Sequence, residues 1–187
     1  DIVSRQMATA KLADGEWHDP ASQLRLDLAP LEAWSTEQPS QSGVRWYARH
    51  PDGSLIQLTM EMSNPLGPPF SSNEYRDSLE KAFSATVEEA DVSQLSDADD
   101  LPLERVIQMR VEGTIDGQKT RVRLWHFKLD DLVFTFSLQA PDGAFSEHVE
   151  EARKVLESAE VTEQAESSGS DDNEKNGIIE FEVEDEK

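Results

Sequence analysis

Hydrophobic and polar residues alternate along several short stretches of the chain, which is the period of a half-buried β-strand. The first stretch spans residues 23–28, where three leucines fall on one face. Similar runs span residues 44–50 and 55–62. The intervening Pro51-Asp52-Gly53-Ser54 has the residues of a turn, so these two runs are predicted to pair as a hairpin.

Three further strand-like runs follow one another closely, at residues 103–113, 119–129 and 132–140. Asp116-Gly117 lies between the first two and is a strong hairpin signal. A second short turn at Asp130-Asp131 joins the last two. Parallel neighbours would need long crossover connections, so these runs predict an antiparallel meander.

Two other stretches change to the helical period. Ser71-x-x-Glu74 has the form of a capping box, and apolar residues then recur at helical spacing from Tyr75 to Val87. A second apolar stripe over residues 145–156 predicts a helix that packs on a sheet. Strands, helix, strands and helix in that order predict an α+β fold, an antiparallel β-sheet backed by two main helices. The acidic residues 91–100 are expected to form an exposed connection.

The composition divides the chain into three parts. Residues 1–15 show weak periodicity and are predicted to be an N-terminal leader or linker, and residues 16–160 form the α+β domain. Residues 161–187 are predicted to be an acidic, largely irregular tail, because this composition buries too little apolar surface to offset its ordering entropy. Within the tail, residues 178–184 alternate apolar and acidic side chains. This segment could add as an edge strand, either to this protein's own sheet or to that of a partner.

The formal net charge of −22 arises from 39 acidic and 17 basic residues among 187. A field of this sign repels phosphate backbones and anionic lipid surfaces, so we expect no nucleic-acid partner. A protein partner, including one with a basic face, remains compatible, although the charge also serves solubility. No run of 18 apolar residues exists, so we expect no direct membrane span.

The chemistry-bearing residues do not form a recognisable catalytic motif. The chain has no cysteine, which excludes disulfides, zinc–thiolate sites and cysteine nucleophiles. Serine nucleophile motifs and glycine-rich phosphate loops are also missing from the sequence. We therefore expect a non-enzymatic protein without a cofactor.

The histidines are scattered along the sequence, and neither His-x-x-x-His nor Glu-x-x-His spacing joins them. No metal site is therefore expected from them. His126 is predicted to face away from Trp125 and Phe127, because side chains alternate along a strand. The acidic run Asp97-Ala98-Asp99-Asp100 lacks the glycine and the terminal glutamate of a calcium loop, so a solvated acidic turn is favoured over a weak calcium site.

Most aromatic residues on the predicted strands are expected in the core, but any that remain exposed would form a binding patch. Trp125 is our candidate on the sheet. Phe70 is the candidate in the proline-rich loop that flanks it. The strand-like segment of the tail contributes the apolar residues Ile179, Phe181 and Val183 as further partner-binding candidates.

The chain resembles the fold group that contains PsbP (the extrinsic photosystem II subunit), the Ran-binding Mog proteins, the DcrB lipoproteins and chaperones of type VI secretion effectors. The resemblance covers about residues 15–161. The segments that carry it are Trp17-His18-Asp19-Pro20, the strand 24–30 with Trp34, the helix start 71–75, the strand 133–140 and the closing helix from Phe145 to Ala159. The closing Ser158-Ala159 lacks the aromatic neighbour usual in the group. Members of the group are mostly scaffolds, assembly factors or chaperones, so the resemblance implies a protein without a catalytic centre.

Three hypotheses for function follow. The leading one is an accessory or assembly subunit that contacts partners through its sheet face and its acidic tail. The alternatives are a cytoplasmic chaperone that cradles an apolar helix of a client, as type VI effector chaperones do, and a small-ligand enzyme on the same fold. The sequence starts at Asp1 without an initiator methionine. From this start we expect an extracytoplasmic protein, periplasmic or exported, with a cytoplasmic location as the alternative.

Overall fold

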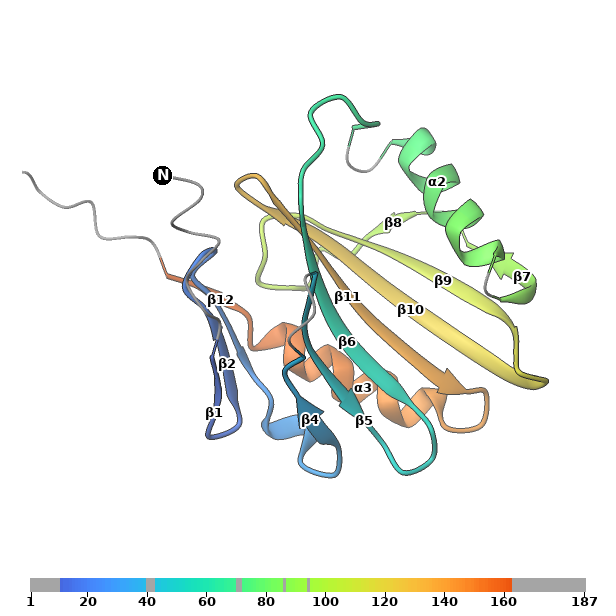
Figure 1. Ribbon diagram of the computed structural model, residues 1–187, viewed down its shortest axis with the longest axis horizontal. Coiled ribbons are helices and arrows are strands. Elements are labelled where there is room, and N and C mark those ends of the chain that lie inside the picture. Colours follow the sequence, from blue (N-terminus) through green and yellow to red (C-terminus); the bar gives the residue numbers. More distant parts are fainter. Residues whose placement is uncertain (1–10, 40–42, 70–71, 86, 94, 163–187) are drawn as a thin grey trace, which may run out of the picture.

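The computed structural model describes residues 11–39, 43–69, 72–85, 87–93 and 95–162. These residues form two antiparallel sheets, two α-helices and one short 3-10 helix (Figure 1). The larger sheet has the strand order β4-β5-β6-β11-β10-β9-β7, and β8 pairs with β9 beside it. The α+β fold predicted from the sequence, an antiparallel sheet packed with two helices, is confirmed.

The strands of the larger sheet have the following bounds: β4 (Ser35–Glu37), β5 (Val44–Arg49), β6 (Leu55–Met62), β7 (Glu88–Val92), β8 (Ser96–Asp97), β9 (Val106–Ile115), β10 (Gln118–Leu129) and β11 (Leu132–Pro141). The smaller sheet has the order β1-β2-β3-β12. Its strands are β1 (Lys11–Ala13), β2 (Glu16–Asp19), β3 (Leu24–Asp27) and β12 (Glu160–Val161). The helices are η1 (Ala29–Leu31), which is the 3-10 helix, α2 (Asn73–Ser84) and α3 (Phe145–Glu157).

The predicted meander and hairpins are present at the expected places. Strands β9, β10 and β11 pair in sequence order, and β5 pairs with β6. At the β9–β10 turn Asp116 and Gly117 have φ angles of 51° and 78°. Two positive φ angles in a two-residue loop are the requirement of a type I′ turn, which explains why Asp-Gly stands there.

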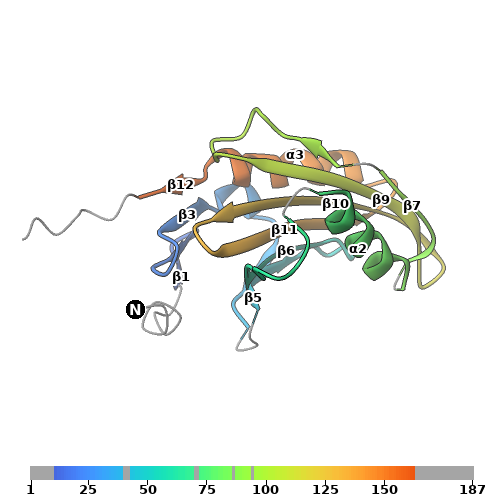
Figure 2. The same cartoon turned by 90° about the horizontal axis from the view of Figure 1, so that it is seen from above.

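The main hydrophobic core lies between one face of the larger sheet and a layer made of α3, η1 and the smaller sheet (Figure 2). Helix α3 contributes four fully or largely buried residues at helical spacing to this core: Phe145, Ala152, Val155 and Leu156. The Ser158 hydroxyl, just past the helix, accepts a hydrogen bond of 2.9 Å from the amide of Asp27 on β3. The smaller sheet is thereby tied to the end of α3.

Helix α2 lies on the opposite face of the larger sheet (Figures 1 and 2). Its Leu79 and Phe83 pack against a second cluster that includes Met109 and Leu124 of β9 and β10. The sequence indicated a sheet whose helices cover one face, and this expectation was wrong. Periodicity shows which side of a helix is apolar, but it does not show which face of the sheet the helix covers.

Three local predictions also need correction. The acidic stretch 91–100 is not a plain connection, because β7 and β8 pair with β9. Residues 11–13, placed in the leader, form β1, which pairs with β2. Helix α2 is capped by Ser72, whose hydroxyl accepts a hydrogen bond from the Tyr75 amide, rather than by the predicted box at Ser71. Ser71 itself is outside the described residues.

Gly113 of β9 lies opposite the irregular part of β7, where the chain that leaves α2 joins the edge of the sheet. A Cβ atom at this position would stand 2.4 Å from Cγ1 of Val87 and 2.8 Å from the carbonyl oxygen of Glu88. Such separations do not fit any side chain, so glycine allows this close approach of β7 to β9.

Candidate functional site

Two histidines that are far apart in the sequence meet beside the turn between β5 and β6. His50 follows β5, and its amide donates a hydrogen bond of 2.9 Å to the carbonyl oxygen of Ser54. Within this turn Oδ1 of Asp52 accepts a hydrogen bond of 2.8 Å from the Ser54 amide. A short carboxylate that bonds the backbone two residues ahead is typical of such turns, and it fixes the position of Asp52.

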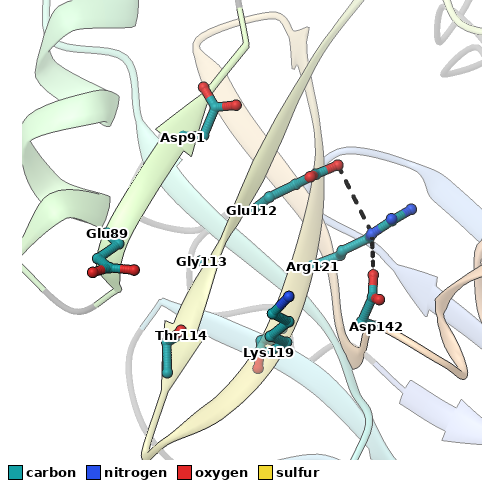
Figure 3. Close-up of a pocket in the computed structure, with 9 residues that line it drawn as sticks. Glu89, Asp91, Glu112, Gly113, Thr114, Lys119, Arg121 and Asp142 are labelled. Carbon is teal, nitrogen blue, oxygen red and sulfur yellow. Dashed lines mark ion pairs between the residues drawn. The ribbon is translucent and has the colours of Figure 1, made fainter.

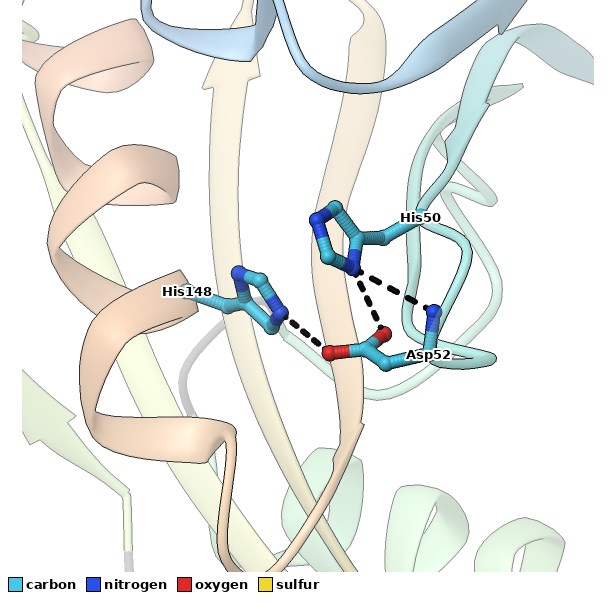
Figure 4. Close-up of side chains that lie close together, drawn as sticks. All are labelled: His50, Asp52 and His148. Atoms are coloured by element: carbon cyan, nitrogen blue, oxygen red, sulfur yellow. Dashed lines mark hydrogen bonds and ion pairs between the residues drawn. The ribbon is translucent and has the colours of Figure 1, made fainter.

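His148 reaches this turn from the first half of α3 (Figure 4). Its Nε2 lies 2.7 Å from Oδ2 of Asp52, and its Nδ1 lies 2.8 Å from Oε2 of Glu151, one helical turn further along α3. The side chain of His148 is only 3% exposed, whereas that of Asp52 is 31% exposed. The imidazole is therefore held between two carboxylates on an otherwise buried helix face.

Trp34, which follows η1, closes the cluster from the third side. Its Nε1 donates a hydrogen bond of 2.9 Å to the same Oε2 of Glu151 that contacts His148. Its ring meets the His148 ring edge-on, with 4.7 Å between the centroids. The position of Glu151 is thus set by two partners at once. We refer to His50, Asp52, His148 and Glu151 as the imidazole–carboxylate cluster.

The electrostatics of the cluster favour charge on both partners of the Asp52–His148 pair. Burial by itself lowers the pKa of His148, but its hydrogen bonds to Asp52 and Glu151 outweigh burial and raise that pKa above the ordinary value. For Asp52, burial alone acts to raise the pKa. The hydrogen bonds from His148, Ser54 and His50 are stronger and hold the pKa of Asp52 well below its usual range.

The cluster also has the donor atoms of a metal site. One ligand atom each from His50, Asp52 and His148 can be chosen so that all lie within 4.8 Å of one another. The sequence-based view that the histidines are scattered was wrong for these two, since tertiary packing joins them. Two local signals were present: His148-x-x-Glu151 on a predicted helix and His50-x-Asp52 in a predicted turn. Neither spacing shows by itself that the helix and the turn meet.

A second feature is the part of the sheet face that α2 leaves uncovered. On β5, β6 and β11, alternate residues such as Trp46, Leu58 and Phe136 enter the main core. Their neighbours in sequence must therefore point to the opposite face. Two registered rows of such side chains cross the three strands. We call them the open strip, and they are Tyr47, Gln57 and Ser137 in one row and Arg49, Leu55 and Gln139 in the other.

The open strip is polar and partly exposed. Five of its six residues are of intermediate exposure and Arg49 is exposed. The guanidinium of Arg49 lies over the Tyr47 ring, 5.2 Å from its centroid. The Tyr47 hydroxyl donates to a carboxylate oxygen of Glu37 on β4, and this contact raises the pKa of Tyr47. Towards β10 the strip ends where Leu124 enters the cluster under α2.

A shallow polar depression of about 310 Å³ lies across β7, β9 and β10 (Figure 3). Arg121 stands between Asp142, at 2.5 Å from Nε, and Glu112, at 3.8 Å. Because these carboxylates already face a guanidinium, they are poor candidates for binding a cation. We interpret the depression as a solvated, ion-paired part of the surface.

The residues predicted to contact a partner fall in different places. Trp125 is 2% exposed and packs against Phe136 in the main core, so its ring is not on the surface. Phe70, Ile179, Phe181 and Val183 lie outside the described residues. His126 faces away from Trp125 as predicted, but it is only 1% exposed because α2 covers that face.

The acidic run that was weighed as a weak calcium site is largely engaged within the protein. Asp100 pairs with Arg153 of α3, and Asp97 lies 4.0 Å from Nε of Arg105. Ala98 between them is buried in the main core. These contacts agree with an acidic turn that Ala98 anchors in the main core.

Comparison with known proteins finds relatives by structure alone. No protein-family model matches the sequence, and no curated protein matches it. The solution structure of cyanobacterial PsbP (CyanoP) from Synechocystis sp. PCC 6803 superposes with a TM-score of 0.52 at 13% identity, covering 83% of this chain and 94% of that one. LpqN of Mycobacterium tuberculosis, described as involved in cell envelope biogenesis, gives 0.53 at 14% identity and covers 74% and 84% of the two chains.

A protein from Bacteroides thetaiotaomicron gives a TM-score of 0.53 at 14% identity, covering 83% of this chain and 51% of that one. The predicted resemblance to the PsbP-like fold group is thereby confirmed. At these identities the likeness establishes the fold and does not identify a partner or an activity. Within the described residues, neither helix is long and apolar enough to cross a membrane.

Proposed function

We propose that this chain is a non-enzymatic accessory domain that binds a protein partner on the open strip. The observation that carries this proposal is the unequal covering of the sheet. One face is closed by α3, η1 and the smaller sheet, whereas α2 covers only the β9–β10 side of the other face. Three paired strands therefore present two ordered rows of side chains to solvent.

The chemistry of the open strip fits a polar protein surface. Gln57 and Gln139 are amides that both donate and accept hydrogen bonds, and Ser137 lies between β6 and β10 on the central strand. Paired strands hold the backbone of these residues at fixed spacing, which limits the backbone entropy lost on binding. Together with the net charge of −22, this favours a partner that presents basic and hydrogen-bonding groups.

The same surface argues against the chaperone alternative. A protein that cradles an apolar client helix needs a continuous apolar groove. In the open strip Leu55 is the one aliphatic residue, and polar or charged side chains surround it. A client helix laid there would bury amide and guanidinium groups without matching partners, at a cost of about 1–3 kcal/mol for each unsatisfied group.

The contacts of the histidines also favour a non-enzymatic role. His126 lies 2.9 Å from the Thr135 hydroxyl, the geometry of a base next to a nucleophile, but it is 1% exposed beneath α2 and out of reach of a substrate. His148 is occupied on both ring nitrogens by carboxylates. A general base needs a free nitrogen within hydrogen-bonding distance of the proton that it removes.

The structural relatives support an accessory role outside the cytoplasm. One relative is a cyanobacterial PsbP, and LpqN is described as involved in cell envelope biogenesis. We infer an extracytoplasmic location from the structural likeness to PsbP and LpqN. The acidic tail would add a second contact, through the strand-like segment at 178–184.

Photo-cross-linking in the native extract tests the proposal. A photoreactive residue at Gln57 reports on the open strip, and one at Lys154, exposed on α3, is the matched control. We expect a discrete adduct from Gln57 that Lys154 does not give and that Ser137→Arg abolishes by placing a bulky cation beside it. A chain recovered only as a monomer from both positions, or an adduct that Ser137→Arg leaves unchanged, would overturn the proposal.

A further inference from the structure

The imidazole–carboxylate cluster can be interpreted as a metal site as well as a salt-bridged histidine. It is independent of the open strip, since it lies on the side of the sheet that α3 covers. We propose that His50, Asp52 and His148 bind one divalent transition-metal ion, with Glu151 orienting His148 from behind.

The donor set points to the class of ion. Two imidazole nitrogens and one carboxylate oxygen suit Zn²⁺, Co²⁺ or Ni²⁺, whereas Ca²⁺ and Mg²⁺ prefer oxygen ligands alone. Nδ1 of His50 lies 2.9 Å from Oδ1 of Asp52, and Nε2 of His148 lies 2.7 Å from Oδ2. Ligand atoms around a tetrahedral ion with bonds of about 2.0–2.1 Å stand about 3.3 Å apart. Small side-chain movements therefore convert the hydrogen-bonded arrangement into a coordinated one.

The contact between Glu151 and His148 is a second and independent indication. A histidine that binds a metal through one nitrogen commonly donates its other N–H to a carboxylate, which fixes the tautomer and the ring plane. Oε2 of Glu151 accepts at Nδ1 of His148, so Nε2 is the nitrogen directed at the site. Trp34 in turn fixes Glu151 through its Nε1. The ion pair between Asp52 and His148 does not require Glu151. A Glu151 side chain that is itself held by Trp34 is what a metal-binding His148 would need to keep its ring oriented.

Exposure and charge are also suitable. The side chains of His50 and Asp52 are 25% and 31% exposed, whereas that of His148 is 3% exposed. The ion thus has a route from solvent, and water can complete the coordination of an otherwise anchored site. Asp52 and Glu151 supply two negative charges around a dication, so occupancy would neutralise both carboxylates.

Binding would join two elements that the sequence separates widely. His50 and Asp52 lie on the β5–β6 turn, and His148 lies on α3. An ion that binds only the folded arrangement stabilises it in proportion to the logarithm of its concentration over the dissociation constant. The site is therefore expected to act as a structural clamp between the hairpin and α3.

To test this proposal, the full chain is first freed of metal with a chelator. It is then titrated with Co²⁺, which is followed by visible absorption, and separately with Zn²⁺, which is followed by calorimetry. A large excess of Mg²⁺ occupies the carboxylates of the acidic surface. We expect one saturable site with the intense visible bands of four-coordinate Co²⁺. We also expect a rise in the melting temperature on adding Zn²⁺.

Variants assign the ligands. His50→Ala and Asp52→Asn, both on a partly exposed turn, should weaken binding by at least about tenfold, and Glu151→Gln by about 10–100-fold, the range typical of outer-sphere partners. His18→Gln, on β2 of the smaller sheet, is the matched control and should bind as the parent does. Absence of a saturable site, or His50→Ala binding as tightly as His18→Gln, would overturn the proposal. Circular dichroism confirms that each variant is folded before it is titrated.

Discussion

Nε2 of His148 lies 2.7 Å from Oδ2 of Asp52, although the two residues are 96 positions apart in the sequence. The contact holds the β5–β6 turn against α3, on the covered side of the sheet (Figure 4). It exists only when the hairpin, the meander and the closing helix are all in place, so it reports on the folding of the whole domain.

Removing the charge of Asp52 should destabilise the protein. In Asp52→Asn the charge-assisted bond to His148 is lost while the shape of the side chain is kept. The free energy of unfolding should fall by about 1.5–3 kcal/mol, as is usual for hydrogen bonds to charged groups. Urea denaturation in the presence of a chelator measures this value. Asp99→Asn, at an exposed position, is the control, and an equal effect in both variants would contradict our view of the pair.

His126 should make the domain sensitive to acid. Burial beneath α2 lowers its pKa from 6.5 to about 4, so the folded protein resists its protonation. Stability contributed by the neutral ring is fully present above pH ~6.5 and is lost as the pH falls towards ~4, because the unfolded chain takes up the proton first. The loss should approach about 3 kcal/mol.

The measurement for His126 is chemical denaturation at a series of pH values for the parent and for His126→Asn, whose amide can still bond the Thr135 hydroxyl. The difference between the two curves isolates this residue from other titrating groups. The two proteins should diverge between pH ~6.5 and ~4 and run parallel at higher pH. Parallel curves throughout would mean that His126 is not buried as described.

Gly113→Ala should be strongly destabilising. The added methyl group would meet Cγ1 of Val87 at 2.4 Å and a backbone oxygen at 2.8 Å. Overpacking of this kind costs about 1–3 kcal/mol. Gly143→Ala is the matched control, since nothing lies within 4 Å of the new Cβ there. Thermal unfolding compares the two, and equal melting temperatures would argue against the close approach of β7 to β9.

Ser72→Ala should weaken α2 by removing its N-terminal cap. The hydroxyl accepts a hydrogen bond of 3.1 Å from the Tyr75 amide, and loss of such a cap costs about 1 kcal/mol. Ser84→Ala, at the other end of the helix, is the control. Amide exchange of α2 should accelerate in the first variant alone, and faster exchange in both would point away from the cap.

Much of this fold was predictable because its signals are local. The Asp-Gly turn and the alternation of Trp125, Phe127 and Leu129 predicted the meander, and the stripe from Phe145 to Leu156 predicted α3. These features depend on residues a few positions apart. The strand pairing of the meander and helix α3 can therefore be predicted from short stretches of the sequence.

What escaped prediction depends on distant packing. Strand β7, with the sequence Glu-Glu-Ala-Asp-Val, lacks clear alternation and forms because β9 offers it an edge. The burial of His126 follows from the side on which α2 packs. The imidazole–carboxylate cluster follows from the meeting of a turn with a helix 96 residues later. No local spacing encodes these relationships.

Our central claim, that a partner covers the open strip, is tested most directly by cysteine footprinting, because the chain has no cysteine of its own. Single cysteines at Gln57, Gln139 and Lys154 are labelled with a thiol reagent in the purified protein and in the native extract. The account predicts that labelling at Gln57 and Gln139 slows severalfold in the extract while Lys154 is unchanged. Equal labelling rates at all three positions in both samples would contradict it.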